Sequence, residues 1–460
     1  MGNDEMLSPD DWADAEIDEG VSETDLELIS SEPEYARLPS DSGFLVLGGA
    51  EAGSVIAELP AGSSKTAKAV KAIKSRDEAL GGKQPLYMVQ RSAQRYKPIP
   101  HLLARLHADF SGHLALGLIG KLPGVTKKSH QDFFDICPTA SVRIVDPVCF
   151  LLDEGLLRLQ PNPISPRAIK NAPYLRDPEA TDWVPSVLAH QREAGANLLL
   201  SPGRALDPDT PQKSLDASCA EAEDALAYLY KGERLALNLT VPARWLTSSA
   251  LRERLFNQLV DQDQFNVVYI RVQWAQEKSF APPCDAALID GIKELSNVCM
   301  DEERKLILPQ TGVTGWLALA FGAAGFGIGI SSSEQAFSEH AFRRRSPGST
   351  EVERYFERQL IHTVERATHG TLSKREGYAR CACPYCVTLH SEPRWLHEVS
   401  GYHHLYAVAE LTAKVQMDSD RGGRHGAVRR AVRSAQRFAS GLPLAGPSIP
   451  RHLDAWGQAL

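Results

Sequence analysis

The sequence predicts an α/β protein: a TIM-type (β/α)8 barrel followed by a C-terminal zinc-binding helical module. Two observations carry this prediction. Short apolar runs alternate with helical stretches through the middle of the chain, and a cysteine cluster followed by histidines stands near its end. The chain has 460 residues, 43% hydrophobic and 23% charged, which is the composition of a soluble globular protein with a large core.

Eight apolar runs have the length and composition of buried strands, and they cover residues 86–89, 113–119, 142–145, 197–200, 235–241, 267–272, 305–308 and 326–330. Helical segments such as 217–230 and 248–260, with apolar residues at three-to-four spacing, separate them. Near-continuous apolar strands joined by helices indicate parallel strands covered by helices. This many units over roughly 220 residues favours a closed barrel over an open doubly wound sheet. No Gly-x-Gly-x-x-Gly follows an early strand, which argues against a dinucleotide site.

In such a barrel the residues just past the C-terminal ends of the strands form the active face. By this criterion the candidates are Asp146, Ser201, Arg204, Thr240, Arg244, Gln273, Trp274, Gln310 and Thr311. Any one of them alone is explained equally well as a loop or cap residue. Their common location is what makes the set a candidate site.

A compact cysteine cluster, Cys381, Cys383 and Cys386, predicts a metal site. An odd number of sulfurs does not form disulfides among themselves, and Zn²⁺ takes four nitrogen or sulfur ligands in a tetrahedron. Three thiolates and one imidazole would form a closed, structural zinc site. The spacing leaves the fourth ligand open among His390, His397, His403 and His404.

The remaining cysteines are scattered through apolar or mixed sequence, as free thiols in a reducing compartment are, so we expect a cytoplasmic protein. The first residues are acidic and lack an apolar stretch, so no secretory signal is expected. The uncharged run 309–333 is broken by glycines, and its continuous apolar part falls short of the ~20 residues that a spanning helix needs. We expect a buried helix and a buried strand there, and no membrane association.

Charge is distributed unevenly along the chain, whose formal net charge is −8. Residues 4–34 carry many acidic side chains and no lysine or arginine, so we expect a disordered acidic tail over residues 1–40. Residues 41–110 receive no fold assignment. The barrel is predicted over 111–345, the zinc-binding and basic helical module over 346–440, and a C-terminal tail over 441–460, of which the Pro- and Gly-rich stretch 441–450 is expected to be loosely docked.

Within the predicted module, Thr350 and Glu353 have the spacing of a capping box, which predicts a helix running to Val364. Basic residues are frequent in this part of the chain: Arg343, Arg344, Arg345, Lys374, Arg375, Arg380, Arg421, Arg424, Arg429, Arg430, Arg433 and Arg437. A basic end beside a metal site indicates a polyanionic partner such as nucleic acid. For residues 427–438 taken alone, a solvated helix face explains the pattern equally well.

A barrel, then Cys-x-Cys-x-x-Cys, then the helical sequence His403-His404-Leu405-Tyr406 resembles the tRNA-guanine transglycosylase family, including its DNA-acting relatives that insert 7-deazaguanines. The resemblance implies that His403 is the fourth zinc ligand. It also implies exchange of a guanine base through a covalent intermediate, with two barrel carboxylates. His390 stays an alternative ligand, because the interval after Cys386 is shorter than in bacterial members.

The resemblance assigns roles to individual residues. Residues 145–150 match an Asp-Ser-Gly-Gly-Phe-like motif in Asp146 and Phe150 but lack its Ser-Gly core. Asp146 would then act in acid/base chemistry or base recognition. The family's nucleophilic aspartate is expected within 325–337, where the carboxylate present is Glu334. The candidate substrate-binding residues are Phe150, Ser201, Arg204 and Gln310.

Three functions follow. The first is a transglycosylase-like enzyme acting on a nucleobase in tRNA or DNA. The second is a non-catalytic accessory subunit of the same fold that binds nucleic acid or a protein partner. The third is a barrel enzyme with an unrelated small-molecule substrate. The sequence leaves open whether the polymer is RNA or DNA, and whether the protein acts alone, as a homodimer or as a heterodimer.

Overall fold

The computed structural model describes residues 44–49, 52–58, 72–91, 96–153, 155–157, 166–275, 280–338, 352–392, 395–415 and 421–460. The predicted tail 1–40 lies outside these ranges. The chain divides into two compact units, residues 1–63 and 64–460. In the first, strand β1 (Phe44–Gly49) pairs antiparallel with β2 (Ala52–Glu58). The second unit contains the barrel and the C-terminal module.

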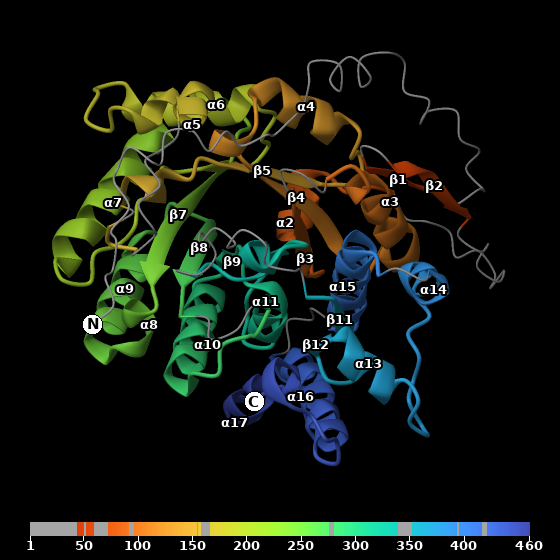
Figure 1. Ribbon diagram of the computed structural model, residues 1–460. Helices are drawn as coiled ribbons and strands as arrows, with labels where there is room; N and C mark the ends of the chain where they lie inside the picture. The colour runs from red at the N-terminus through yellow and green to blue at the C-terminus, as the bar shows by residue number, and fades with distance from the viewer. Residues whose placement is uncertain are drawn as a thin grey trace, which may run out of the picture. The chain divides into compact units, whose positions relative to one another are not determined.

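The barrel is an eight-stranded parallel sheet with the order β5-β4-β3-β10-β9-β8-β7-β6 (Figure 1). Its strands are β3 (Leu86–Gln90), β4 (Ala115–Lys121), β5 (Val142–Asp146), β6 (Leu199–Leu200), β7 (Leu235–Pro242), β8 (Val267–Gln273), β9 (Lys305–Leu308) and β10 (Gly325–Ile328). The two end strands are joined at Arg143, whose carbonyl accepts from the N–H groups of Asn197 and Leu198 at 3.0 and 3.2 Å. The sheet is therefore a nearly closed barrel, as predicted.

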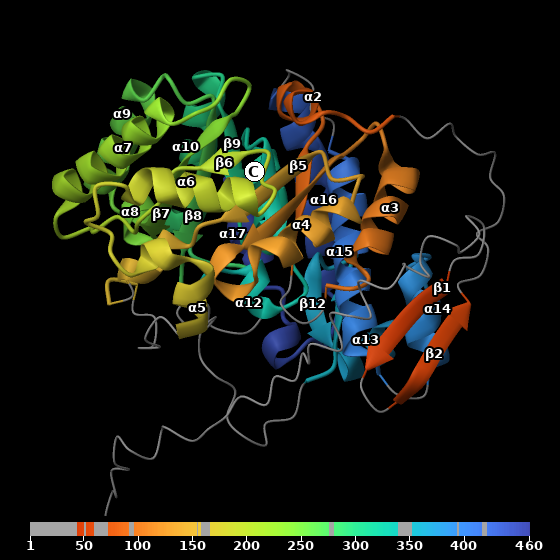
Figure 2. The same cartoon turned by 90° about the horizontal axis from the view of Figure 1, so that it is seen from above.

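Helices follow the strands along the chain and lie outside them, as the two views in Figures 1 and 2 show. The principal ones are α3 (Ile99–Phe110), α4 (Lys127–Asp135), α6 (Trp183–Glu193), α7 (Pro211–Ala227), α9 (Ser249–Asp261), α10 (Ala286–Asp301) and α11 (Gly312–Leu319). Shorter ones are α2 (Arg76–Gly81), α5 (Pro166–Asn171), α8 (Arg244–Thr247) and α12 (Ser332–Gln335). Their amphipathic pattern explains this placement, since α3 buries Leu102, Leu103 and Leu106 on one face.

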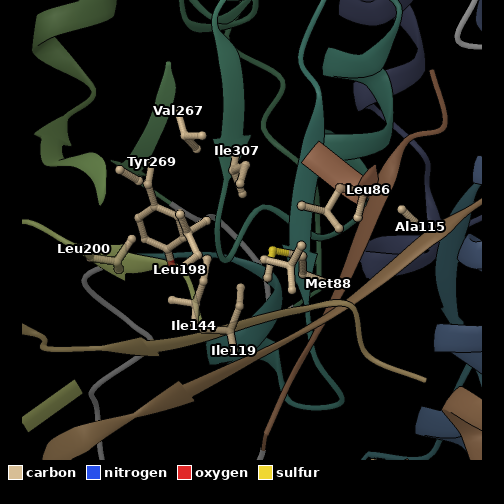
Figure 3. Close-up of a cluster of buried hydrophobic side chains, with 13 residues drawn as sticks. Leu86, Met88, Ala115, Ile119, Ile144, Leu198, Leu200, Val267, Tyr269 and Ile307 are labelled. Atoms are coloured by element: carbon tan, nitrogen blue, oxygen red, sulfur yellow. The ribbon is translucent and has the colours of Figure 1, made fainter. Parts of the chain in front are cut away.

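Apolar side chains fill the barrel interior, as Figure 3 shows for Met88, Ile144 and Tyr269 among others. Side chains alternate between the two faces of a strand, so residues two positions further along face the same interior. Two positions after Ile144 and Tyr269 come Asp146 and Arg271, at the C-terminal ends of β5 and β8. The alternation therefore places charged side chains directly above an apolar core.

All eight predicted strands are confirmed, with shifts of a few residues at their ends. The barrel begins earlier than the predicted boundary at residue 111, because β3 is its first strand. The uncharged run 309–333 forms α11 and β10, whose residues are buried. Within the described ranges, no helix is long and apolar enough to cross a membrane.

The C-terminal module begins with a hairpin, in which β11 (Arg354–Glu357) pairs antiparallel with β12 (His362–Glu365). The helix predicted to run to Val364 is therefore wrong. Apolar residues at 355, 356, 360, 361 and 364 fit a helical period, yet a short run of this kind also fits two strands and a turn. Ile361 has φ 49°, which turns the chain between the strands.

The hairpin is followed by α13 (Arg366–Leu372), α14 (Pro384–Ser391), α15 (His397–Ala413), α16 (Arg421–Ala439) and α17 (His452–Ala459). The predicted C-terminal tail 441–460 contains α17, and this helix is docked. Trp456 is fully buried, with its ring centroid 6.4 Å from that of Trp316 on α11. Lys293 on α10 donates to the carbonyl of Ala459 at 2.7 Å. The chain end thus packs against barrel helices.

Candidate metal centre and barrel mouth

Three cysteines and one histidine of the module come together in space. Cys383 is the N-cap of α14, Cys386 lies in the first turn of that helix, and His403 lies on α15. The Nδ1 atom of His403 is 3.9 Å from the sulfur of Cys381 and 3.3 Å from those of Cys383 and Cys386. All four donor atoms lie within 4.8 Å of one another, so the group could hold a metal ion.

The geometry and the donor types suit zinc. A tetrahedral zinc ion with bonds of about 2.3 Å to sulfur and about 2.0 Å to nitrogen would separate such donors by roughly 3.6 Å. Three thiolates and one imidazole form a closed set, with no position left for a substrate. His403, Cys383 and Cys386 are buried. A metal held here would organise structure.

Neighbouring groups orient the ligands. The Nε2 atom of His403 lies 2.8 Å from the carbonyl of Phe356 on β11, so Nε2 carries the proton and Nδ1 is left to face the sulfurs. The hydroxyl of Tyr355 lies 3.1 Å from the sulfur of Cys386, and the Tyr355 ring stacks on that of His403 at 4.3 Å. Strand β11 of the hairpin thereby orients His403 and Cys386 in the cluster.

The alternative ligand His390 is not part of the cluster; its ring stacks at 5.2 Å on that of His369. His404, the next residue on α15, is buried against the ring of Phe356. Within the described residues, His403 is therefore the histidine that completes the donor set, as the family resemblance implied.

At the barrel mouth, Asp146 is buried and its carboxylate is already engaged. One oxygen accepts from the backbone N–H of Val148 at 2.8 Å. The other accepts from the hydroxyl of Tyr269 at 3.2 Å and from the guanidinium of Arg271. Both partners of the ion pair are essentially inaccessible to solvent, at 1% and 0% exposure. Asp146 therefore has a counterion within the barrel.

Arg271 occupies the centre of the mouth and links three of the predicted residues. Its Nε donates to Gln310 at 3.1 Å and its Nη1 to Thr240 at 2.9 Å. The guanidinium carbon lies 4.5 Å from the ring centroid of Phe150 and 5.6 Å from that of Phe337. These two rings contact each other edge to face at 4.9 Å. Aromatic and guanidinium groups thus fill the space above the core.

Glu334 also lies at this end of the barrel, where it caps a helix. Its carboxylate accepts from the backbone N–H of Ser331 at 3.0 Å, which completes a capping box on α12. Burial raises the pKa of Glu334, and the hydrogen bonds from Ser331 oppose this rise. Gly329 makes room for the side chain, because a Cβ there would lie 2.4 Å from that of Glu334.

Lys121, at the end of β4, is a fourth charged residue at the mouth, beside Asp146, Arg271 and Glu334. Burial and the nearby charge of Arg271 lower the pKa of Lys121, while Asp146 and Glu334 raise it. Asp146 and Glu334 therefore both lie within electrostatic reach of the same amine. Two surface hollows lie elsewhere, at the N-terminal ends of the strands, one beside Ala115 and one beside Leu86.

The other two predicted substrate-binding residues, Ser201 and Arg204, have structural partners. The hydroxyl of Ser201 accepts from the N–H of Asn238 at 2.9 Å, inside the barrel wall. Arg204 pairs with Asp153 at 2.8 Å on the rim, with about a third of its side chain exposed. Among the described residues, Arg271 donates to Asp146, Thr240 and Gln310, and not to Ser201 or Arg204. The structure thus brings together Asp146, Phe150 and Gln310, but not Ser201 and Arg204.

Residues 146–150, which match an Asp-Ser-Gly-Gly-Phe-like motif in Asp146 and Phe150, have an unusual backbone conformation at Val148. Val148 stands where that motif has a glycine, and its φ is 57°. A β-branched residue in the left-handed region is strained by roughly 1–3 kcal/mol. The hydrogen bond from its N–H to Asp146 and its burial beside Phe150 hold the turn in place.

Sequence reasoning missed Arg271, Tyr269 and Lys121. A signal was present for Arg271, because it is an arginine inside an otherwise apolar strand, in register with Tyr269 and Val267 on the inward face. Charged residues are rarely buried unless they are paired. The partner, Asp146, is 125 positions away in the sequence, and only the fold shows that the two meet.

A basic surface covers one side of α16. Val428, Val432 and Ala435 are buried, whereas the arginines at 429, 430, 433 and 437 are exposed. Their spacing of three, four, seven and eight residues places them on one side of the helix. Residues 421–439 include no Asp or Glu, and none of these four arginines has an ion pair among the described residues.

The fold and the cysteine–histidine cluster together define an α/β-barrel protein with a C-terminal candidate metal centre. Comparisons with known proteins add no family: no family model matches the chain, and no curated protein matches it either. What the protein does must therefore be argued from its own residues.

Proposed function

We propose that this protein binds nucleic acid through its metal-organised C-terminal module, on a scaffold like that of tRNA-guanine transglycosylases, and that its barrel does not exchange bases. The observation that carries the proposal is the arginine face of α16, which has no counter-charge on its own helix. A chain with a net charge of −8 that concentrates arginines on one exposed face has a surface suited to phosphates.

The basic surface extends beyond the helix. Arg375 donates to the carbonyl of Gly441, just after α16, at 3.3 Å. Leu372 and Tyr378 pack in one apolar cluster with Phe438 at the end of α16. The exposed residues Lys374, Arg375 and Arg380 therefore belong to a segment anchored at the C-terminal end of the arginine face. An anchored basic surface of this kind favours phosphate binding over a simple solvated helix face.

The metal in this proposal is a structural Zn²⁺ ion held by Cys381, Cys383, Cys386 and His403. Its four protein ligands would leave it no role in activating water. It would hold α14, α15 and the β11–β12 hairpin in one arrangement. We also place the protein in the cytoplasm, since none of its eight cysteines, all of which lie in the described ranges, is in a disulfide.

The barrel mouth supports the non-catalytic part of the proposal. A nucleophilic or base-binding carboxylate needs room for a substrate, and the Asp146 carboxylate already accepts from Val148, Tyr269 and Arg271. Phe150, Phe337 and Arg271 pack together at the barrel mouth, where a base would have to enter. Admitting a base would mean separating a buried ion pair, which costs several kcal/mol.

The arginine face makes a quantitative prediction. Changing Arg429, Arg430, Arg433 and Arg437 to glutamine should weaken tRNA or DNA binding at low salt. It should also reduce the slope of log K against log salt by up to about 3 units, since each lost phosphate contact removes roughly 0.7 to 0.9. Fluorescence anisotropy across a salt series measures both effects.

A matched control changes four exposed lysines outside the module to glutamine, namely Lys83, Lys170, Lys213 and Lys231. This control changes the net charge by the same amount as the arginine variant. Because the four lysines lie outside the proposed interface, the slope of log K against log salt should stay nearly unchanged. Equal effects of the two quadruple variants, or wild-type binding that does not depend on salt, would reject α16 as the interface.

A second candidate function is base exchange itself, with Asp146 in acid/base chemistry and Glu334 as the nucleophile. One observation favours it: Asp146 and Glu334 both raise the pKa of Lys121, so both carboxylates lie near the same amine at the barrel mouth. Incorporation of labelled guanine into tRNA and into DNA decides between the two candidates. We expect none with the wild-type protein. Incorporation that is abolished by Asp146→Ala, in a variant that remains folded, would establish the enzyme instead.

A further inference from the structure

Arg91 is a buried cation outside the sites described above. It follows β3, and its side chain points away from the barrel interior, because Leu86 and Met88 face inward and side chains alternate. Its guanidinium carbon lies 4.3 Å from the ring centroid of Tyr96 and 5.1 Å from that of Phe133 on α4. The residue is 6% exposed. Arg91 is thus held between two aromatic rings.

The guanidinium has donors without acceptors. Its Nη2 donates to the hydroxyl of Ser129 at 3.1 Å, whereas Nε and Nη1 are buried with no hydrogen-bond partner. Within the described part of the chain, its electrostatic neighbours are Tyr96, the thiol of Cys137 and the imidazole of His130, and none of them is a carboxylate. Burial raises the pKa of the Cys137 thiol to about 12, so it is uncharged. A desolvated guanidinium normally has an anionic or hydrogen-bonding partner.

Ser129, which accepts the hydrogen bond from Arg91, lies at the N-terminus of a helix. Ser129 is the third residue of α4, which begins at Lys127 after the N-cap Thr126. Thr126 accepts from the N–H groups of Ser129 and His130. The N–H groups of Lys127 and Lys128 have no acceptor within the helix, and the helix dipole adds positive potential there. The Lys128 side chain is exposed at the same turn.

We propose that Arg91 and the first turn of α4 form a binding site for an oxyanion of the phosphate type, on the outer side of the barrel and separate from the arginine face of α16. The oxyanion would accept hydrogen bonds from the unused guanidinium donors and from the first N–H groups of the helix. Glu193 pairs with the side chain of Lys127 at this turn, so the oxyanion would supply negative charge to Arg91, which has no such partner among the described residues. Helix N-termini combined with arginine are suited to phosphate for these reasons.

The test measures binding of inorganic phosphate to the full-length protein with its metal, by equilibrium dialysis of radiolabelled phosphate at constant ionic strength. We expect saturable binding of one phosphate per chain. Arg91→Met should weaken it roughly ten- to hundredfold, the effect of losing hydrogen bonds to a charged group. Lys213→Gln, which removes one exposed positive charge outside this site and outside α16, should leave it unchanged. Binding that is absent, or equal in wild type and Arg91→Met, would overturn the proposal.

The Arg91→Met variant should fold, because methionine fills similar space between the two rings and removes an uncompensated buried charge. Its melting temperature without phosphate should therefore equal or exceed that of the wild type. Added phosphate at matched ionic strength should raise the wild-type melting temperature only. A purely structural Arg91 predicts the opposite: a lower melting temperature for the variant and the same response to phosphate in both proteins.

The source of the oxyanion is decided by competition. An oligothymidylate that displaces labelled phosphate from the quadruple glutamine variant of α16 would identify a phosphodiester of nucleic acid. Displacement by free phosphate or sulfate but not by the oligonucleotide would identify a free oxyanion. Arg91→Lys, which keeps the charge but loses the planar donors, should bind phosphate more weakly than the wild type in either case.

Discussion

Cys383→Ser is expected to abolish metal binding and to unfold the C-terminal module. Cys383 is buried and its sulfur is 3.3 Å from Nδ1 of His403, so the change removes one of the four ligands. Cys383 makes no side-chain hydrogen bond to α14, and serine is a good N-cap residue, so the helix start itself is left intact. Structural zinc sites contribute on the order of 10 kcal/mol of folding free energy. Removal of the metal with a chelator should reproduce the effect. Elemental analysis of the purified protein, together with limited proteolysis of the module, measures it.

Cys284→Ser is the matched control, because Cys284 is exposed and lies outside the cluster. It should retain one metal ion per chain and wild-type resistance to protease. A Cys383→Ser protein that still carries one tightly bound metal ion would show that the donor set has been assigned incorrectly. His390→Ala should behave as the wild type if His403 is the fourth ligand.

The second large effect is expected at the barrel mouth. Arg271→Met leaves the Asp146 carboxylate buried without its counterion, and breaking a buried pair in this way typically costs about 3–5 kcal/mol. The double variant Arg271→Met with Asp146→Asn removes both charges and should recover much of the loss. Urea denaturation of the two single variants and the double variant gives the coupling energy between the two residues.

Arg204→Met serves as the comparison, because the Arg204–Asp153 pair on the rim is partly exposed. Its loss of stability should be clearly smaller, since solvent screens such pairs. If Arg271→Met were no more destabilising than Arg204→Met, the mouth would be open to water. The case against base exchange would then lose its main support.

The barrel could be predicted because each of its strands is recognisable from a short local run of residues. Runs such as 267–272 are rich in valine and isoleucine and are separated by helical periods, and no distant information is needed to recognise them. The cysteine ligands were predictable for the same reason, since Cys381, Cys383 and Cys386 are neighbours in sequence. His403 needed the family resemblance, because four histidines follow the cysteines.

What the sequence could not predict depends on distant contacts or on short ambiguous runs. The Asp146–Arg271 pair joins strands that are far apart in the chain, and it gives the candidate catalyst Asp146 a buried counterion that no local pattern reveals. The β11–β12 hairpin was mistaken for a helix because its apolar positions fit both periods. Helix α17 was missed because a Pro- and Gly-rich stretch before it suggested a loose tail.

Helix α15 also connects the first barrel strand to a late part of the chain. The hydroxyl of Tyr87, on that strand, donates to the carbonyl of Leu405 at 2.7 Å across 318 positions of sequence. The Tyr406 hydroxyl similarly donates to Asp109 on α3 at 2.6 Å. On the ribosome, we expect β3 to pair early with the next strand, β4, whereas its contact with α15 can form only after most of the chain has been synthesised. Contacts of such long range are expected to slow the last steps of folding.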